Sequence, residues 1–97
     1  TSVKSVIFDN DKEFDIDGVF IEVGSIPNSD LAKRISVKTN EKDEIIINRK
    51  SETNIPGIFA AGDVADAPFK QAITGVAEGV IAAYSAFDYV KKMNIEY

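Results

Sequence analysis

A glycine and a carboxylate follow a short apolar run, and these two residues are the first candidates for chemistry. Residues 58–61 (Ile-Phe-Ala-Ala) are typical of a short strand covered on both faces, and Gly62 and Asp63 come directly after them. Open α/β sheets bind ligands at the carboxyl ends of such strands. There a Gly lets the backbone approach the ligand, and an Asp can accept hydrogen bonds from its hydroxyls. A Gly-Asp pair taken alone is more often only a turn, and that alternative stays open at this point.

The start of a helix follows this pair and would offer hydrogen-bond donors. Asp66 is a suitable N-cap and Pro68 suits a first turn, so we expect one long helix over residues 69–92. Its leading N–H groups, around residues 69–72, would be unpaired and would carry a partial positive charge. A flavin meets both requirements, because its ribityl hydroxyls donate to a carboxylate and the N1–C2=O edge of its reduced ring is anionic. The spacing is compatible with a flavin without singling it out.

The same helix has the composition of an element that packs closely. Apolar side chains recur at the helical period, and Gly75 and Gly79 lie among small residues. A Gly in a helix interior costs about 1 kcal/mol relative to Ala, so we expect another element to approach there. Three aromatic residues of the helix are expected in the core: Tyr84, Phe87 and Tyr89.

The composition excludes most familiar catalytic groups. The 97 residues include no Cys and no His, so thiolates, disulfides, iron–sulfur ligands and imidazoles are all missing. A net charge of −5 disfavours nucleic acid as a partner. No apolar run is long enough for a membrane span or a signal peptide, so we expect no membrane association and a cytoplasmic location.

Short strands and turns are expected around these residues. A polar turn at residues 9–12 predicts a hairpin at the start of the chain, and Ser29 or Asp30 should begin a short helix that ends at Arg34. Together with the long helix, this pattern predicts an α/β fold, and a chain of this length has room for at most one core. The expected strands are residues 2–8, 13–17, 19–23, 45–47 and 58–61.

Three segments together resemble a known family. Residues 53–64 (Thr-Asn-Ile-Pro-Gly-Ile-Phe-Ala-Ala-Gly-Asp-Val) and 70–74 (Lys-Gln-Ala-Ile-Thr), with the small-residue helix, closely resemble the C-terminal flavin-binding segment of bacterial and archaeal thioredoxin reductases. Residues 17–28 resemble the stretch in which that family's chain leaves its NADPH-binding domain and re-enters its FAD-binding domain. Because these segments occur in the family order and span most of the chain, the resemblance is more specific than a lone nucleotide-binding fingerprint.

The resemblance implies roles for five residues. Asp63 would accept a hydrogen bond from the FAD ribityl chain, and Gly62 would let the backbone approach the cofactor. Gln71 and Ala72 would face the flavin pyrimidine edge through their backbone N–H groups. Lys70 stands where many relatives have Arg, so a bidentate contact would be replaced by a point charge. No residue of the chain is expected to be catalytic or to bind a metal.

The implied fold is α/β, the C-terminal fragment of a Rossmann-like FAD-binding domain with short strands and one long C-terminal helix. Residues 1–24 would be the terminal strands of the NAD(P)H-binding domain, and residues 28–97 the C-terminal half of the FAD-binding domain. The family's Gly-x-Gly-x-x-Gly loop, NADPH loop and Cys-x-x-Cys pair do not occur here. We therefore interpret the chain as part of a longer enzyme and expect it to be inactive alone. The parent would transfer a hydride from NADPH to FAD and then deliver electrons to a disulfide.

The resemblance also implies partners. They are the missing N-terminal portion of the same enzyme and, for the parent, a thioredoxin-like protein. Exposed apolar faces would favour self-association, so a homodimer is a further expectation. Two alternatives stay open: a noncatalytic scaffold or subunit module without bound cofactor, and part of a ferredoxin or flavodoxin reductase that lacks the Cys pair.

Overall fold

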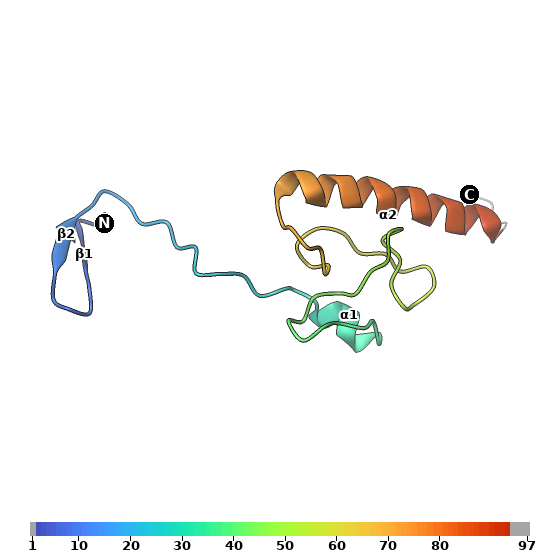
Figure 1. The fold of residues 1–97 in the computed structure, drawn as a ribbon, viewed down its shortest axis with the longest axis horizontal. Coiled ribbons are helices and arrows are strands. Elements are labelled where there is room, and N and C mark those ends of the chain that lie inside the picture. Colours follow the sequence, from blue (N-terminus) through green and yellow to red (C-terminus); the bar gives the residue numbers. More distant parts are fainter. Residues whose placement is uncertain (1, 94–97) are drawn as a thin grey trace.

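The computed structural model describes residues 2–93, which begin with a two-stranded hairpin (Figure 1). Strand β1 (Ser5–Ile7) pairs antiparallel with β2 (Glu13–Asp15), with Val6 opposite Phe14. The Asp11 N–H donates to the Phe8 carbonyl at 3.0 Å and closes the polar turn. The rings of Phe8 and Phe14 meet edge to face, with their centroids 5.5 Å apart. The predicted hairpin is therefore confirmed.

The segment that follows the hairpin is extended and makes few contacts. The strand predicted at residues 19–23 is not formed, and Phe20 in its middle is 95% exposed. No main-chain hydrogen bond joins residues 17–26 to any other residue that the structure describes. A strand needs a neighbour for its N–H and C=O groups, which explains why an apolar alternating pattern alone does not produce one here.

The extended segment gives the molecule an elongated shape. Figure 1 shows the hairpin at one end and the two helices at the other. The radius of gyration is 19.8 Å, whereas a compact domain of this length would have about 13 Å. The described part of the chain is therefore not compact.

Helix α1 (Asp30–Arg34) opens the larger part of the molecule at the predicted position. The Lys33 N–H donates to the Ser29 carbonyl at 3.0 Å, which sets the first turn. Lys33 and Arg34 lie in the last turn, where positive charge opposes the negative end of the helix dipole. The chain then folds back, and the Val37 N–H donates to the Ala32 carbonyl at 3.0 Å.

The two strands predicted at residues 45–47 and 58–61 are reduced to single bridges. Ile45 pairs antiparallel with Thr39 and parallel with Ala65, and Phe59 pairs antiparallel with Glu52. Residues 58–61 are only half-buried, so the prediction of a strand covered on both faces is wrong. The hydrophobic core of the described residues consists of Val37, Ile45 and Ala65. The fold is α/β in content, and its only two-stranded sheet among the described residues is the hairpin.

The long helix α2 (Ala72–Lys92) starts three residues later than predicted, and Asp66 does not cap it. The Asp66 carboxylate instead accepts a hydrogen bond from the Ile47 N–H at 3.0 Å. At the true start, the Gln71 N–H donates to Thr74 Oγ1 at 3.1 Å, and that hydroxyl donates to the Gln71 carbonyl at 2.8 Å. The Asp66 carboxylate is thus occupied by a residue far away in the sequence, and the cap that the local sequence predicted is not formed.

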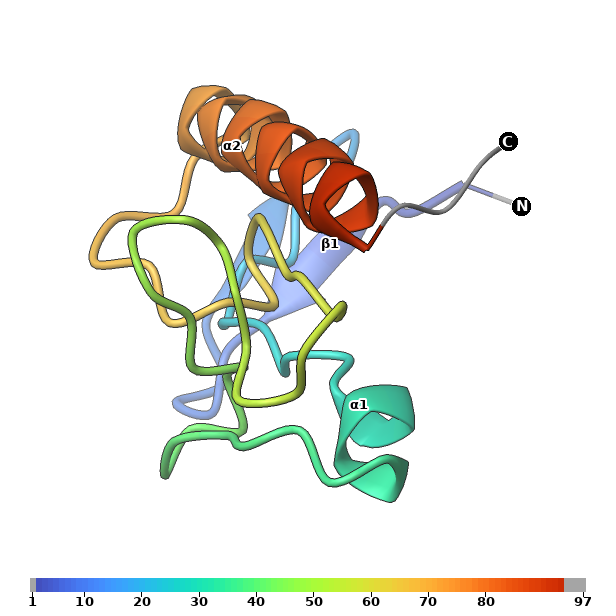
Figure 2. The ribbon, with the colours of Figure 1, turned by 90° about the vertical axis from the view of Figure 1, so that its right-hand side faces the viewer.

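One face of α2 rests on the loops beneath it and the other is open (Figure 2). The Tyr89 ring meets the Phe59 ring edge to face at 6.3 Å and is half-buried. Ile73, Tyr84 and Phe87 on the open face are exposed. The expectation that Tyr84 and Phe87 are core residues is therefore wrong, because no described element covers that face.

Gly57 should resist substitution by any residue with a side chain. Its φ is +82°, in the left-handed region, and a Cβ there would lie 3.1 Å from the Tyr89 ring. We expect Gly57→Ala to lower the free energy of unfolding by about 1–3 kcal/mol, measured by urea titration of the chain. Gly18→Ala is the matched control, since a Cβ at Gly18 meets nothing within 4 Å. Equal stability of the two variants would contradict this account of the turn.

The exposed apolar side chains should cause self-association. Phe20 and Val23 in the extended segment and Ile73 on α2 are all open to solvent. Sedimentation velocity at rising protein concentration should show dimers or larger species, and Ile73→Lys should reduce their fraction. A sedimentation coefficient that stays monomeric at millimolar concentration would contradict this expectation.

Candidate functional site

The turn of residues 62–65 carries the Gly-Asp pair and is tied to a distant segment. Gly62 has φ +82°, and the Ala65 N–H donates to its carbonyl at 2.9 Å. The Ile45 N–H donates to the Val64 carbonyl at 2.8 Å, while Ala65 is completely buried. Asp63 lies exposed at the tip of this turn, and its carboxylate has no hydrogen bond or ion pair with any described residue. The carboxylate is therefore available as an acceptor.

Helix α2 holds the same turn from the other side. The Gly62 N–H donates to Glu78 Oε2 at 2.8 Å. Gly75 faces Gly62 so closely that a Cβ on Gly75 would lie 3.4 Å from the Gly62 Cα. The close approach predicted from the helix glycines is therefore confirmed at Gly75, whereas a Cβ on Gly79 would meet nothing within 4 Å among the described residues. Glu78 itself was not among the predicted site residues, and its only sequence signal is a carboxylate placed between Gly75 and Gly79 on a helix of small residues.

Lys70 connects the turn to a third segment. Its Nζ donates to the Asp63 main-chain carbonyl at 2.6 Å and forms an ion pair with Glu44 Oε1 at 2.5 Å. Asn40 Nδ2 donates to the other Glu44 oxygen at 2.6 Å. The pKa of the Glu44 carboxyl is lowered, chiefly by the Lys70 hydrogen bond and next by that from Asn40. Glu44 is a second residue that the sequence did not point to.

The leading end of α2 presents backbone donors. The N–H groups of Ala72 and Ile73 donate to no other described residue. The Gln71 N–H is already bonded to the Thr74 hydroxyl, and the Lys70 ammonium is paired with Glu44. Of the five predicted site residues, Lys70 contacts the Asp63 carbonyl, and Gly62 contacts α2 at Gly75 and Glu78. Gln71 and Ala72 follow Lys70 at the start of that helix. Of these groups, the Asp63 carboxylate and the Ala72 N–H are free of bonds to described residues.

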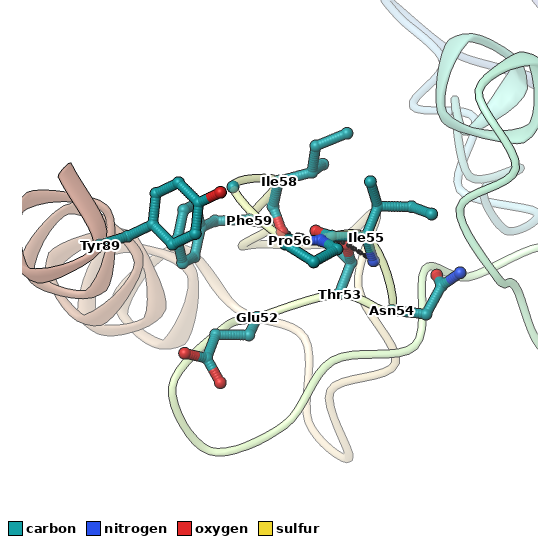
Figure 3. Close-up of a pocket in the computed structure, with 9 residues that line it drawn as sticks. Glu52, Thr53, Asn54, Ile55, Pro56, Ile58, Phe59 and Tyr89 are labelled. Carbon is teal, nitrogen blue, oxygen red and sulfur yellow. Dashed lines mark hydrogen bonds between the residues drawn. The ribbon is translucent and has the colours of Figure 1, made fainter. Parts of the chain in front are cut away.

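A separate hollow lies away from this turn. It has a volume of about 250 Å³ and is lined by residues 52–59 and Tyr89 (Figure 3). The Thr53 hydroxyl donates to the Ile58 carbonyl at 2.9 Å, and Glu52 accepts from Asn48 Nδ2 at 2.7 Å. These two polar groups are satisfied within their own loop.

Residues 2–93 contain no group of three or more acidic residues arranged to hold a metal ion. None of the helices in that range has the length and apolar character needed to cross a membrane.

Comparison with known proteins gives the family. Residues 1–79 match the family described as pyridine nucleotide-disulphide oxidoreductase. The chain belongs to this family. It is 48% identical over 75 residues to the F subunit of the alkyl hydroperoxide reductase of Staphylococcus aureus, a match that covers 77% of this chain and 15% of that protein.

Solved structures agree with the family. The thioredoxin reductase of Lactococcus lactis is 38% identical with a TM-score of 0.71, over 84% of this chain and 26% of that one. The thioredoxin reductase of T. acidophilum is 37% identical with the same TM-score, over 86% of this chain and 27% of that one. The resemblance seen in the sequence is thus confirmed. The chain spans only about a quarter of these structures and less of the curated relative.

The Glu44 ion pair should make the stability of the chain depend on pH. The folded-state pKa of Glu44 lies below its ordinary value of 4.5. Its stabilising contribution is therefore fully present above about pH 4.5 and is lost as the pH falls through the folded-state value. We expect Glu44→Gln to be less stable than the native chain at pH 7, with the difference narrowing as the pH falls towards 3.

Urea unfolding at several pH values checks this expectation. Glu41→Gln is the matched control, because Glu41 is an exposed acid in the same loop. A stability difference for Glu44→Gln that stays constant from pH 7 to pH 3 would rule out the ion pair as its source.

Proposed function

We propose that this chain supplies the ribityl and isoalloxazine contacts of a FAD site in a thioredoxin reductase-like oxidoreductase. One observation carries the proposal: the Asp63 turn contacts the first turns of α2 at Gly75 and Glu78, and the N–H groups at the leading end of that helix are free of bonds to described residues. Asp63 would accept a hydrogen bond from a ribityl hydroxyl, and Gly62 would allow the backbone to approach the cofactor. The Ala72 N–H, together with the start of α2, would donate to the pyrimidine edge of the flavin.

The chemistry of these groups fits a flavin. An exposed carboxylate suits a chain of hydroxyls, and unpaired N–H groups at the positive end of a helix dipole suit an edge that becomes anionic on reduction. When bound, FAD supplies hydride and electron transfer between NADPH and a disulfide. The residues of this chain bind and orient the cofactor, and they contribute no acid, base or nucleophile.

The two parts of the molecule would belong to different domains of the parent. We assign residues 1–24 to the end of the NAD(P)H-binding domain and residues 28–97 to the C-terminal half of the FAD-binding domain. The unpaired backbone and exposed side chains of the extended segment support this division, since they suit a strand that other parts of a longer chain complete. On this proposal the chain contributes to the reaction without performing it alone.

A second candidate differs only in the electron acceptor. The higher identity to the F subunit of the alkyl hydroperoxide reductase favours a parent that serves a hydroperoxide reductase instead of a thioredoxin-like protein. Both candidates share the flavin site. They are distinguished by comparing NADPH-dependent reduction of thioredoxin with alkyl hydroperoxide consumption in the presence of the remaining reductase subunits, using the full-length parent.

Removing the Asp63 carboxylate should weaken FAD binding. The test uses a chimera in which this chain replaces the matched segment of the Lactococcus lactis thioredoxin reductase. We expect Asp63→Ala to raise the FAD Kd of the chimera about tenfold, because a hydrogen bond to a charged group is lost. Asp63→Asn should have a smaller effect. The FAD Kd is measured by flavin fluorescence titration of the cofactor-free chimera.

The control is Asp17→Ala, which removes an exposed acid in the extended segment. Its FAD Kd should equal that of the unsubstituted chimera. An Asp63→Ala chimera with unchanged FAD affinity would contradict the role of Asp63. A folded chimera that binds no FAD would favour a scaffold without cofactor.

A further inference from the structure

Lys70 is held between two acceptors on different segments. Its ammonium contacts the Glu44 carboxylate at 2.5 Å and the Asp63 main-chain carbonyl at 2.6 Å. The side chains of Lys70 and Glu44 are 26% and 14% exposed, respectively. In contrast, the side chains of the Lys33–Asp43 pair, whose acid directly precedes Glu44, are 36% and 54% exposed. The Lys70–Glu44 pair is therefore the better shielded of the two, and its attraction is less screened by solvent.

The positive charge of Lys70 is paired within the protein. A lysine is a flexible point charge that can reach many acceptors, and a fixed partner is needed to hold it in one place. Glu44 is that partner, and the Asn40 amide in turn fixes the Glu44 carboxylate at 2.6 Å. Because Glu44 neutralises Lys70 on one side, the ammonium is directed by its remaining donors to the Asp63 carbonyl.

Glu44 and its neighbour Ile45 hold the turn in complementary ways. Ile45 donates its N–H to the Val64 carbonyl, and its own carbonyl accepts from the Asp66 N–H. Glu44 acts one residue earlier, through Lys70, on the Asp63 carbonyl. These ties act on three consecutive peptide units of the turn that presents the Asp63 carboxylate. Losing one of these ties should allow Asp63 to rotate.

We infer that Glu44 is a positioning residue for the flavin site, acting through Lys70 on the Asp63 turn. Lys70 is accordingly a structural tie in this chain and not a direct contact to the cofactor. The inference rests on the proposed function for its consequence, which is the orientation of the Asp63 carboxylate toward a ribityl hydroxyl. The tie from Glu44 through Lys70 to Asp63 does not depend on the proposed function, because it is a property of the chain without cofactor.

The first experiment measures the tie in the 97-residue chain without flavin. Amide hydrogen exchange of Ala65 reports opening of the turn, because its N–H bonds the Gly62 carbonyl at 2.9 Å. Glu44→Gln and Lys70→Met should each accelerate Ala65 exchange about tenfold, as expected when a charge-assisted hydrogen bond is lost. Lys70→Arg should keep the slow exchange of the native chain, since a guanidinium can donate to both the Glu44 carboxylate and the Asp63 carbonyl.

The matched control for that experiment is Asp43→Asn, which removes the neighbouring ion pair with Lys33. Ala65 exchange in this variant should equal that of the native chain. Equal exchange in the native chain, Glu44→Gln and Lys70→Met would overturn the inference. Fast exchange of Ala65 already in the native chain would overturn it too, because no tie would then hold the turn.

The second experiment measures the consequence in the FAD-binding chimera. Glu44→Gln and Lys70→Met should raise the FAD Kd about tenfold, with Lys70→Arg and Asp43→Asn close to the unsubstituted value. If Asp63→Ala weakens FAD binding but Glu44→Gln does not, the positioning role fails and the proposed function stands. If Asp63→Ala leaves FAD binding unchanged, the proposed function fails, and the exchange data alone then decide whether the tie exists.

Discussion

The contact between Ile45 and the turn of residues 62–65 is the link on which the larger part of the molecule depends. Ile45 and Ala65 form most of the small core with Val37, and two main-chain hydrogen bonds join the segments. Without this link the turn would have no fixed place beneath α2. Polar ties from Glu44 and Glu78 then fix the turn on either side. The core of the described residues contains only three side chains, so the site is held in position largely by hydrogen bonds.

Elements that depend on local signals could be predicted from the sequence. The hairpin follows from alternating side chains around a polar turn, α1 from its terminal residues, and α2 from its apolar period. The strand predicted at residues 19–23 could not form, because a strand also needs a partner and the described residues supply none. The start of α2 was missed because Asp66 accepts from Ile47, a contact that local spacing does not encode. In the first case a missing tertiary contact, and in the second an additional one, overrides the local preference of the sequence.

The site shows the same division between local and distant signals. Gly62 and Asp63 could be placed near the start of α2 because only a few residues separate them, and Gly75 signalled the close approach. Glu44 could not be identified, because its partner Lys70 lies on another segment and isolated acids are common on surfaces. Lys70 was expected to face the cofactor, yet its charge is paired within the protein. A charged residue beside a site can thus serve the geometry of that site instead of the ligand.

Two kinds of interaction therefore have different tasks in this chain. Hydrogen bonds and one shielded ion pair set the orientation of the Asp63 turn and the start of α2, and they do so with little buried apolar area. The large apolar side chains of the extended segment and of the open face of α2 contribute little while they remain in water, because hydrophobic stabilisation requires burial. Since the chain spans about a quarter of its solved relatives, most of that burial must come from surfaces outside it if the family architecture is to form. The geometry of the site is thus set by contacts within this chain, whereas the free energy that would hold it rigid depends on what covers these faces.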